Sequence, residues 1–336
     1  MGNNPVLTIA VPIFNMEWCL GKNLATYADP RLGDRIEVLC LNNASEDRSK
    51  AIIQEYVGER PETFQLIDRD SRGYGSSINA ALAAAAGRYF RIIDADDWVD
   101  TDELVKLVDA LAACDTDVVL TDYRIADMST GTEIPVRAGD KGVPYGEILR
   151  DFYWPTQTLP SIHNTTYRTA FLRSTGFSMP DMRYFVDEEY VIIPYLHAKT
   201  IVYYPYDVYR YQVANPEQST SPKNRAKYSG HREENLKGTI MEYQLALRED
   251  SGNAALSYCR ERIIRGIGDH FTTLYMYVSD RKEGRAMATA WKNYVQANAP
   301  EFWNPVRRKA SLLSFLNRLG VSLPAYLRLK GILLKG

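Results

Sequence analysis

Three carboxylates close together in the sequence are the residues best suited to chemistry. Asp94, Asp96 and Asp97 follow Tyr89, Phe90, Ile92 and Ile93 within the stretch RYFRIIDADDWVDT, residues 88–101. β-Branched and aromatic residues of this kind predict a short buried strand that ends at the acids. Like charges so close repel one another, and hard oxygen ligands favour Mg²⁺ or Mn²⁺ over a softer metal. The stretch therefore predicts a divalent cation site at the carboxyl end of a strand.

The same acids also have a purely structural interpretation. Asp100 or Thr101 would cap the helix that follows, and the remaining carboxylates would simply be solvated. Capping requires one such residue and not a cluster, so the metal site is the favoured hypothesis.

Other polar clusters recur where the predicted strands end. Asn15 and Glu17 follow the first strand, residues 42–47 the second and residues 68–75 the third. Each cluster alone is typical of a turn. Parallel strands would bring all of them to one edge of a sheet, next to the acids. A crevice lined in this way suits a nucleotide, with amides for the base, carboxylates for ribose hydroxyls and a metal for the diphosphate.

Several nucleotide-dependent classes are disfavoured by the motifs. Gly73-Tyr74-Gly75 is not the GxGxxG fingerprint, which would follow the first strand, and the chain has no GxxxxGK[ST] phosphate loop. NAD enzymes and P-loop ATPases are therefore not expected. A metal-dependent phosphotransferase with Asp94 as nucleophile is a weaker alternative, because such an enzyme places its first Asp on an early strand.

The elements that must position these residues alternate between strands and helices. This alternation predicts a parallel sheet built from right-handed βαβ units. The predicted strands are Leu7–Phe14, Ile36–Leu41, Phe64–Ile67, Tyr89–Ile93 and Asp117–Tyr123, and the best-defined helices are Ser76–Ala86 and Thr101–Ala113.

The alternation of predicted strands and helices ends after residue 125. Glycines and a proline in 126–143 predict an irregular or hairpin insertion. Further on, we expect strands at Ile162–Arg168, Thr200–Tyr204 and Val208–Tyr211, and helices at Thr169–Ser174 and Tyr190–Leu196. From about Asn224 the pattern is helical. We therefore predict an α/β domain at 1–222 and a helical region at 223–336.

Composition limits the class of protein further. The chain has 336 residues, 45% hydrophobic and 24% charged, and a net charge of −2, which argues against a general nucleic-acid binder. Its four cysteines are scattered, without the spacing of a zinc site or a disulfide framework, so a reducing compartment fits. The N-terminus reads as a strand and not as a signal peptide. We expect a cytoplasmic protein, one that is at most peripheral on the inner face of the cell membrane.

The C-terminal tail has a composition of its own. Residues 302–336 contain seven Lys and Arg residues and no acid, so the tail carries +7 and the preceding residues −9. Residues 306–336 alternate large apolar with basic residues, as in helices that lie on an anionic membrane surface. Packing on the acidic domain, or on a second subunit of a homo-oligomer, explains the pattern equally well.

Five motifs together resemble the family 2 glycosyltransferases of the GT-A fold. They are VPIFN at 11–15, NNASED at 42–47, GYGSSINAAL at 73–82, GRYFRIIDADDW at 87–98 and VDEEY at 186–190. The resemblance covers roughly residues 5–220. It implies a Rossmann-like, mostly parallel sheet flanked by helices, here with a C-terminal helical extension. It also implies inverting transfer from a nucleotide-diphospho-sugar, most often a UDP-sugar, to a glycan or lipid-linked acceptor in cell-surface polysaccharide synthesis. The alternative is a non-catalytic module that binds nucleotide-sugars.

The resemblance assigns a nucleotide-binding role to residues at the strand ends. Asn43 departs from the family, which often has an Asp at this position, so the identity of the base is less well defined. Asp94 matches the first Asp of the family's DxD motif, near the ribose, and Asp96 the second, which ligates Mn²⁺ or Mg²⁺. The positions that match are Pro12, Asn15, Asn43, Gly73, Asn79 and Asp94 for the nucleotide, and Asp96 with Asp94 for the metal.

Asp187 matches the acid that serves the family as general base. Inverting transfer needs a carboxylate opposite the leaving diphosphate, to accept the proton of the attacking hydroxyl. Glu188 and Glu189 compete for this role, because a shift of one residue in the match would exchange them. Capping of the following helix is the structural alternative for Asp187.

The remaining assignments rest on single residues. Gln218 and Ser219 resemble a polar element that closes over the diphosphate in some family members, and His231 is a candidate further metal ligand. No motif supports His163. Trp154 and Tyr184 are the aromatic residues chosen for acceptor binding, because sugar rings present apolar C–H faces to aromatic rings.

Overall fold

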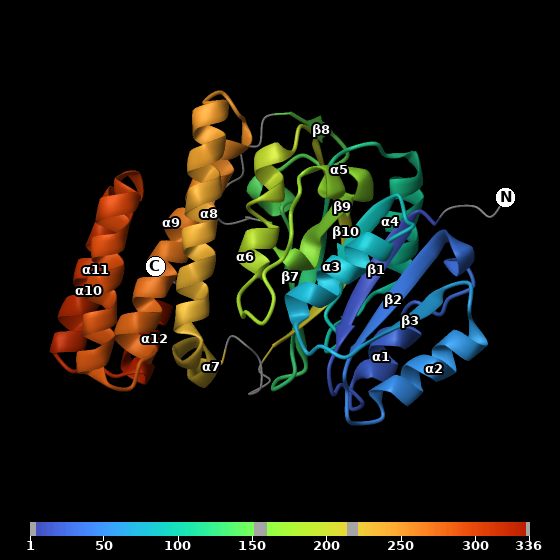
Figure 1. The fold of residues 1–336 in the computed structure, drawn as a ribbon, viewed down its shortest axis with the longest axis horizontal. Helices are drawn as coiled ribbons and strands as arrows, with labels where there is room; N and C mark the ends of the chain where they lie inside the picture. The colour runs from blue at the N-terminus through green and yellow to red at the C-terminus, as the bar shows by residue number, and fades with distance from the viewer. Residues whose placement is uncertain (1–4, 151–159, 214–220, 334–336) are drawn as a thin grey trace. The chain divides into compact units, whose positions relative to one another are not determined.

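The computed structural model of the chain describes residues 5–150, 160–213 and 221–333. It divides into two compact units, Met1–Ala214 and Asn215–Gly336, whereas the sequence was divided between residues 222 and 223. The first unit contains the sheet and the second is helical (Figure 1). Each unit is described by itself.

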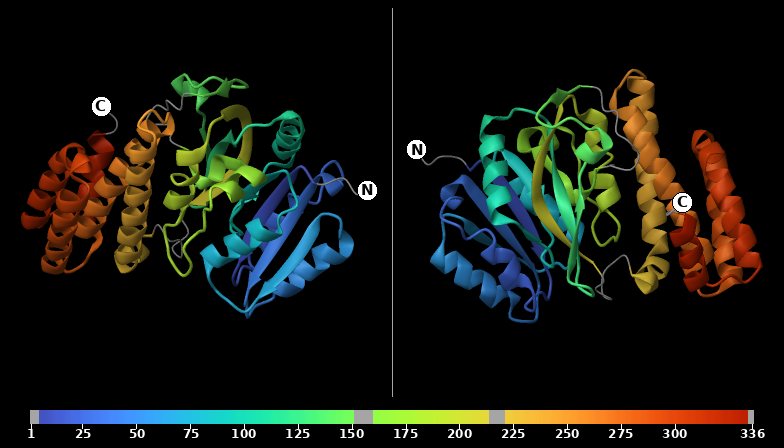
Figure 2. Two further views of the ribbon diagram at one scale, coloured as in Figure 1. Left: turned by 45° about the horizontal axis from the view of Figure 1, so that its top comes forward. Right: turned by 180° about the vertical axis from the view of Figure 1, so that it is seen from behind.

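The strands of the first unit form one curled sheet in the order β3-β2-β1-β4-β9-β6-β10-β5, with β7 beside β6 and β8 beside β10 (Figure 2). β1 pairs in parallel with β2 and β4, and β2 with β3, so their carboxyl ends meet at one edge. β9 runs antiparallel between β4 and β6. The strands are β1 Leu7–Ile13, β2 Ile36–Asn43, β3 Phe64–Arg69, β4 Tyr89–Ile92, β5 Trp98–Val99, β6 Val118–Asp127, β7 Thr132–Val136, β8 Ile148–Leu149, β9 Thr165–Arg168 and β10 Ile201–Val213.

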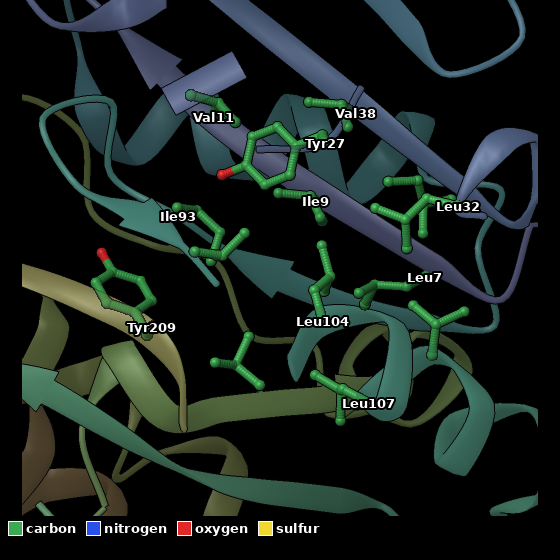
Figure 3. Packing of buried hydrophobic residues seen from close by; sticks show 14 of the residues in the cluster. Leu7, Ile9, Val11, Tyr27, Leu32, Val38, Ile93, Leu104, Leu107 and Tyr209 are labelled. Carbon is green, nitrogen blue, oxygen red and sulfur yellow. The ribbon is translucent and has the colours of Figure 1, made fainter. Parts of the chain in front are cut away.

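Helices cover the sheet and close its core. Leu7, Ile9 and Val11 alternate along β1 and face one apolar cluster with Leu104 and Leu107 (Figure 3). The residues between them on β1 are buried too, as expected for a central parallel strand covered on both faces. The helices of this unit are α1 Leu20–Ala25, α2 Ser49–Glu59, α3 Tyr74–Ala84, α4 Thr101–Ala113, α5 Thr169–Ser174 and α6 Asp187–Tyr190.

The α/β class is confirmed, and α4 and α5 have the predicted bounds. The insertion at 126–143 contains strand β7, which forms an antiparallel hairpin with β6. Gly131, with φ +70°, lies in its turn, a left-handed conformation that glycine adopts at little cost.

Two predictions in the later part of the first unit are wrong. The helix expected at Tyr190–Leu196 is only the short α6 and a 3-10 turn at Pro194–His197. Pro194 lacks the N–H that a continuing helix requires. The two strands expected near residues 200–211 are the single strand β10, whose pairing with β6 shifts register between Tyr204 and Tyr209.

The regular elements described in the second unit are all helices, as predicted. A π-helical turn, Thr273–Tyr277, follows α9 directly. None of the described helices combines the length and the apolar character needed to span a bilayer. The helices are α7 Pro222–Lys227, α8 Ser229–Glu249, α9 Ala255–Thr272, α10 Arg281–Asn298, α11 Trp303–Arg318 and α12 Leu323–Leu333.

Candidate active site

The acidic turn after β4 is held in place by residues from distant parts of the chain. Asn23 of α1 donates hydrogen bonds from Nδ2 to the carbonyl oxygens of Asp94 (3.1 Å) and Asp97 (2.9 Å). The Asp97 carboxylate accepts bonds from the Tyr209 hydroxyl (2.5 Å) and the Gln212 backbone N–H (2.7 Å) of β10. Asp97 is only 2% exposed. It therefore anchors the turn, while its half-buried neighbours are more accessible.

The turn concentrates negative charge in four consecutive positions. Burial, and then the charge of Asp96, raises the pKa of Asp94 and that of Asp97. Burial also raises the pKa of Asp96. Among the described residues, no Lys or Arg forms an ion pair with any of the three. Ionising all three carboxylates is therefore costly unless a cation binds nearby.

The donor set fits a divalent cation. Asp94, Asp97 and His163 each offer one ligand atom, and these atoms lie within 4.8 Å of one another. Burial lowers the pKa of His163 to about 3, so its imidazole is neutral, as a metal ligand must be. Its Nδ1 is buried and has no hydrogen-bond partner among the described residues. Asp96 lies beside this group without belonging to it, and its role as a metal ligand stays a prediction.

Asp187 acts electrostatically on the acidic turn. The Tyr74 hydroxyl donates a 2.8 Å hydrogen bond to Asp94 Oδ1. The pKa of Tyr74 is raised well above its ordinary value by burial, then by the charge of Asp94 and also by that of Asp187. The charge of Asp187 likewise contributes to the raised pKa of Asp94. The charges of Asp94 and Asp187, far apart in the sequence, thus both act on Tyr74.

The two competitors of Asp187 lie in different surroundings. Asp187 is exposed at the first residue of α6. Glu189 is 4% exposed, and burial raises its pKa to about 7. The charge of Glu188 contributes to the raised pKa of Glu189. It is not among the causes of the raised pKa of Asp94. Of the three acids, Asp187 is the one whose charge is felt at Asp94.

Hydrogen bonds join the loop after β1 to the loop after β2. Asn15 adopts a left-handed conformation, φ +54°, and its Oδ1 accepts a 2.8 Å bond from the Glu46 N–H. Asn43 is 3% exposed and accepts a bond from the Ser77 hydroxyl of α3. Pro12 is buried in β1. The contacts of these residues to a nucleotide stay predictions.

The start of α3 is docked against the loop that leads to Asp187. Asn79 donates from Nδ2 to the Met179 carbonyl (2.9 Å) and accepts from the Met179 N–H at Oδ1 (2.8 Å). Asp181 accepts a 3.1 Å bond from the Ser76 N–H. Asn79, matched to the nucleotide pocket by the resemblance, is therefore engaged in holding this loop.

Two glycines make that docking possible. A Cβ at Gly73 would lie 1.7 Å from Asp181 Oδ1, and one at Gly75 would lie 2.0 Å from the Pro180 carbonyl oxygen. A side chain at Gly75 would push the loop backbone away, whereas one at Gly73 would displace the Asp181 side chain. Gly73 was chosen from the sequence, whereas the need for Gly75 becomes apparent only from the packing.

Gly75→Ala is expected to lower the free energy of unfolding by about 1–3 kcal/mol, because its methyl group would overpack against Pro180. Gly21→Ala is the matched control. A Cβ at Gly21 in α1 meets nothing within 4 Å, so this change should stabilise the protein by up to about 1 kcal/mol. Urea unfolding of both variants measures the difference. Equal effects would mean that residues 179–181 are not docked on α3.

The remaining residues assigned to the site from the sequence stay predictions. Trp154, Gln218 and Ser219 lie outside the described residues. The Tyr184 side chain is 39% exposed, with its ring 6.5 Å from that of Phe185, which leaves its acceptor-binding role a prediction. His231 lies in α8 of the second unit, with its ring 5.5 Å from that of Tyr228. Its role as a metal ligand also stays a prediction.

A family comparison decides what kind of protein carries this site. The family model described as glycosyl transferase family 2 matches residues 8–179. The chain belongs to glycosyl transferase family 2. The predicted family membership is therefore confirmed, and the matched residues include the strand-end loops and the acidic turn.

Curated relatives are named as glycosyltransferases, and a solved structure shares the fold of this chain. EpsH of Bacillus subtilis (strain 168), named as a glycosyltransferase, is 23% identical over 62% of this chain, and the match spans 61% of EpsH. EpsJ of the same organism, also named as a glycosyltransferase, is 23% identical over 71% of this chain and 70% of its own length. The structure of Staphylococcus aureus TarS 1–349 covers 94% of this chain and 92% of its own, with a TM-score of 0.57 at 17% identity. The GT-A fold is confirmed.

Proposed function

We propose that this family 2 chain is an inverting glycosyltransferase that transfers a sugar from a UDP-sugar to a glycan or lipid-linked acceptor. Several relatives support this proposal. TarS was solved in complex with UDP-GlcNAc, and further relatives are named for teichoic acid biosynthesis and for glycosylation of poly(ribitol phosphate). Such acceptors belong to cell-surface polysaccharides. The observation that carries the proposal is the acidic turn after β4, where ligand atoms of Asp94, Asp97 and His163 lie within 4.8 Å of one another and the Tyr74 hydroxyl donates to Asp94.

In the proposed reaction, the donor diphosphate lies against the acidic turn and the acceptor approaches from the side of Asp187. The exposed Asp187 carboxylate accepts the hydroxyl proton as the acceptor oxygen attacks the anomeric carbon. The bond from that carbon to the diphosphate oxygen breaks in the same step. Because the attack comes from the face opposite the diphosphate, the configuration at the anomeric carbon inverts. Tyr74 keeps the Asp94 carboxylate oriented through its hydrogen bond.

The proposed metal is Mg²⁺ or Mn²⁺, held by Asp96 and Asp94. His163 is proposed as a further ligand, because its ligand atom lies within 4.8 Å of those of Asp94 and Asp97. When bound, the ion offsets the negative charge that develops on the leaving diphosphate. The protein residues prepare the site for it. Asn23 fixes the backbone of the turn, and Asp97 anchors the turn to β10.

The setting of the reaction is also a proposal. We infer a cytoplasmic enzyme that works close to the inner face of the cell membrane, where lipid-linked acceptors would be available. Tyr184 and Trp154 are the proposed acceptor contacts, and Gln218 and Ser219 the proposed diphosphate contacts. A homo-oligomer is compatible with these roles.

A donor screen tests the proposed function. The full chain is heated with UDP-, GDP- or dTDP-sugars, each with and without Mn²⁺. A UDP-sugar at 100 times its Kd should stabilise the protein by about 2.7 kcal/mol, and only when metal is present. NMR of the product should then show an inverted anomeric centre. Binding without transfer would instead indicate a non-catalytic module, and a phosphorylated Asp94 a phosphotransferase.

A further inference from the structure

One face of α11 is exposed although it carries large apolar side chains. The opposite face packs into the second unit through Val306 and Leu313. Leu312, Phe315 and Leu319 are 54%, 58% and 64% exposed. Their spacing of three and four residues places them in one row along α11 and its C-terminal cap residue. α11 lies on the far side of the second unit from α8 (Figures 1 and 2). The exposed face of a surface helix is normally polar, so this apolar row is unusual.

Arginines border the apolar row. Arg308 lies one turn before Leu312 in the same row. Arg307 and Arg318 lie about three turns apart in the neighbouring row of the helix. All three arginines are exposed, and none forms an ion pair with an acid of the described residues. No acid follows Glu301 in the sequence, so no carboxylate of α11 or α12 offsets their charge. A partner of this face must therefore offer both negative charge and an apolar layer.

An anionic lipid surface has both properties. Its acyl chains would receive the apolar row, and its phosphate groups would contact the arginines at the level of the head groups. An anionic polysaccharide or a nucleic acid offers charge without an apolar layer, so the apolar row would stay in water. A second copy of this chain, docked face to face about a twofold axis, would bring arginines against arginines. Charge complementarity therefore favours the lipid surface.

We propose that α11 docks this chain on an anionic membrane surface, with Leu312, Phe315 and Leu319 inserted and the three arginines on lipid phosphates. The helix would lie in the plane of the surface. None of the described helices could cross the bilayer instead. The inference rests on the membrane setting of the proposed function and adds the face by which the chain is held there. It does not depend on sugar transfer, because α11 lies outside the residues matched by the family model.

Flotation of the full chain with lipid vesicles, without any sugar donor, tests the charge of this face. Vesicles of phosphatidylcholine alone are compared with vesicles that also contain phosphatidylglycerol. We expect at least tenfold stronger partitioning to the anionic vesicles and a steep decrease with added salt, because exposed charges are screened. The triple variant Arg307→Gln/Arg308→Gln/Arg318→Gln should reduce binding to the level of the neutral vesicles.

The apolar row is tested by the triple variant Leu312→Asn/Phe315→Asn/Leu319→Asn. It should weaken binding to the anionic vesicles at least tenfold, because the inserted apolar surface is lost. The matched control is Met241→Asn/Leu245→Asn, which removes two exposed apolar side chains (55% and 43% exposed) from α8. The control should bind the vesicles as the wild type does.

Three results would overturn the proposal. The first is vesicle binding by both triple variants as strong as that of the wild type, or equal binding of the wild type to neutral and anionic vesicles. The second is a lipid-free dimer that the apolar variant turns into a monomer in sedimentation velocity, because the face would then join two copies of the chain. The third is a large loss of thermal stability in the apolar variant, because these side chains would then be covered within the chain. Since the assay contains no donor, none of these results depends on whether the chain transfers sugar.

Discussion

Asp187→Asn is expected to lower the rate of sugar transfer by about 10²–10⁴-fold, the range in which general base catalysis contributes, while the affinity for the donor stays unchanged. Asn keeps the shape of the side chain and removes its ability to accept the hydroxyl proton. Because Asp187 is exposed at the start of α6, the loss of its charge should cost little stability. Turnover and nucleotide affinity are measured on the same preparation, so a folding defect would appear in both.

Glu188→Gln is the matched control for this prediction. It removes the next carboxylate along α6 and should leave turnover within about a factor of two to three of the wild type. Normal turnover in the Asp187 variant would refute the assignment of the base. If the effects of the two variants were exchanged, the base would be Glu188, as a shift of one residue in the motif implies.

The sequence predicted well those features that depend on local chemistry. The strand that ends in Asp94 was visible because apolar residues stop abruptly at a run of acids. The bounds of α4 follow from an N-cap, Asp100, whose side chain accepts from the Glu103 N–H, and from regular apolar spacing. The helix expected at Tyr190–Leu196 failed because apolar spacing in a short segment does not distinguish a helix from packed turns.

Residues that assemble the site through tertiary contacts were not visible in the sequence. Asn23 and Tyr209 bind the acidic turn from elements far before and after it, so no motif spacing relates them. His163 had no motif support, and only the arrangement of strands brings it within ligand distance of Asp94. Pattern reasoning thus found the residues that carry charge. The residues that hold those charged groups in place could be identified only from the three-dimensional structure.

Asp96→Ala is expected to abolish metal-dependent nucleotide binding, so a UDP-sugar with Mn²⁺ would no longer stabilise the protein. Removing the metal from the wild type with a chelator should reproduce that loss. The variant without metal should be no less stable than the wild type, because the charge of Asp96 raises the pKa of both Asp94 and Asp97. Relief of that repulsion contributes on the order of 1 kcal/mol.

The control for this variant is Asp34→Ala, which removes an exposed acid from the turn before β2, at the opposite edge of the sheet. It should retain metal-dependent stabilisation in full. Thermal unfolding with and without Mn²⁺ and UDP-sugar separates the two variants. An Asp96 variant that still gains stability from the metal and nucleotide together would shift the site to Asp94, Asp97 and His163. Asp96 would then act on the bound ion only through its charge.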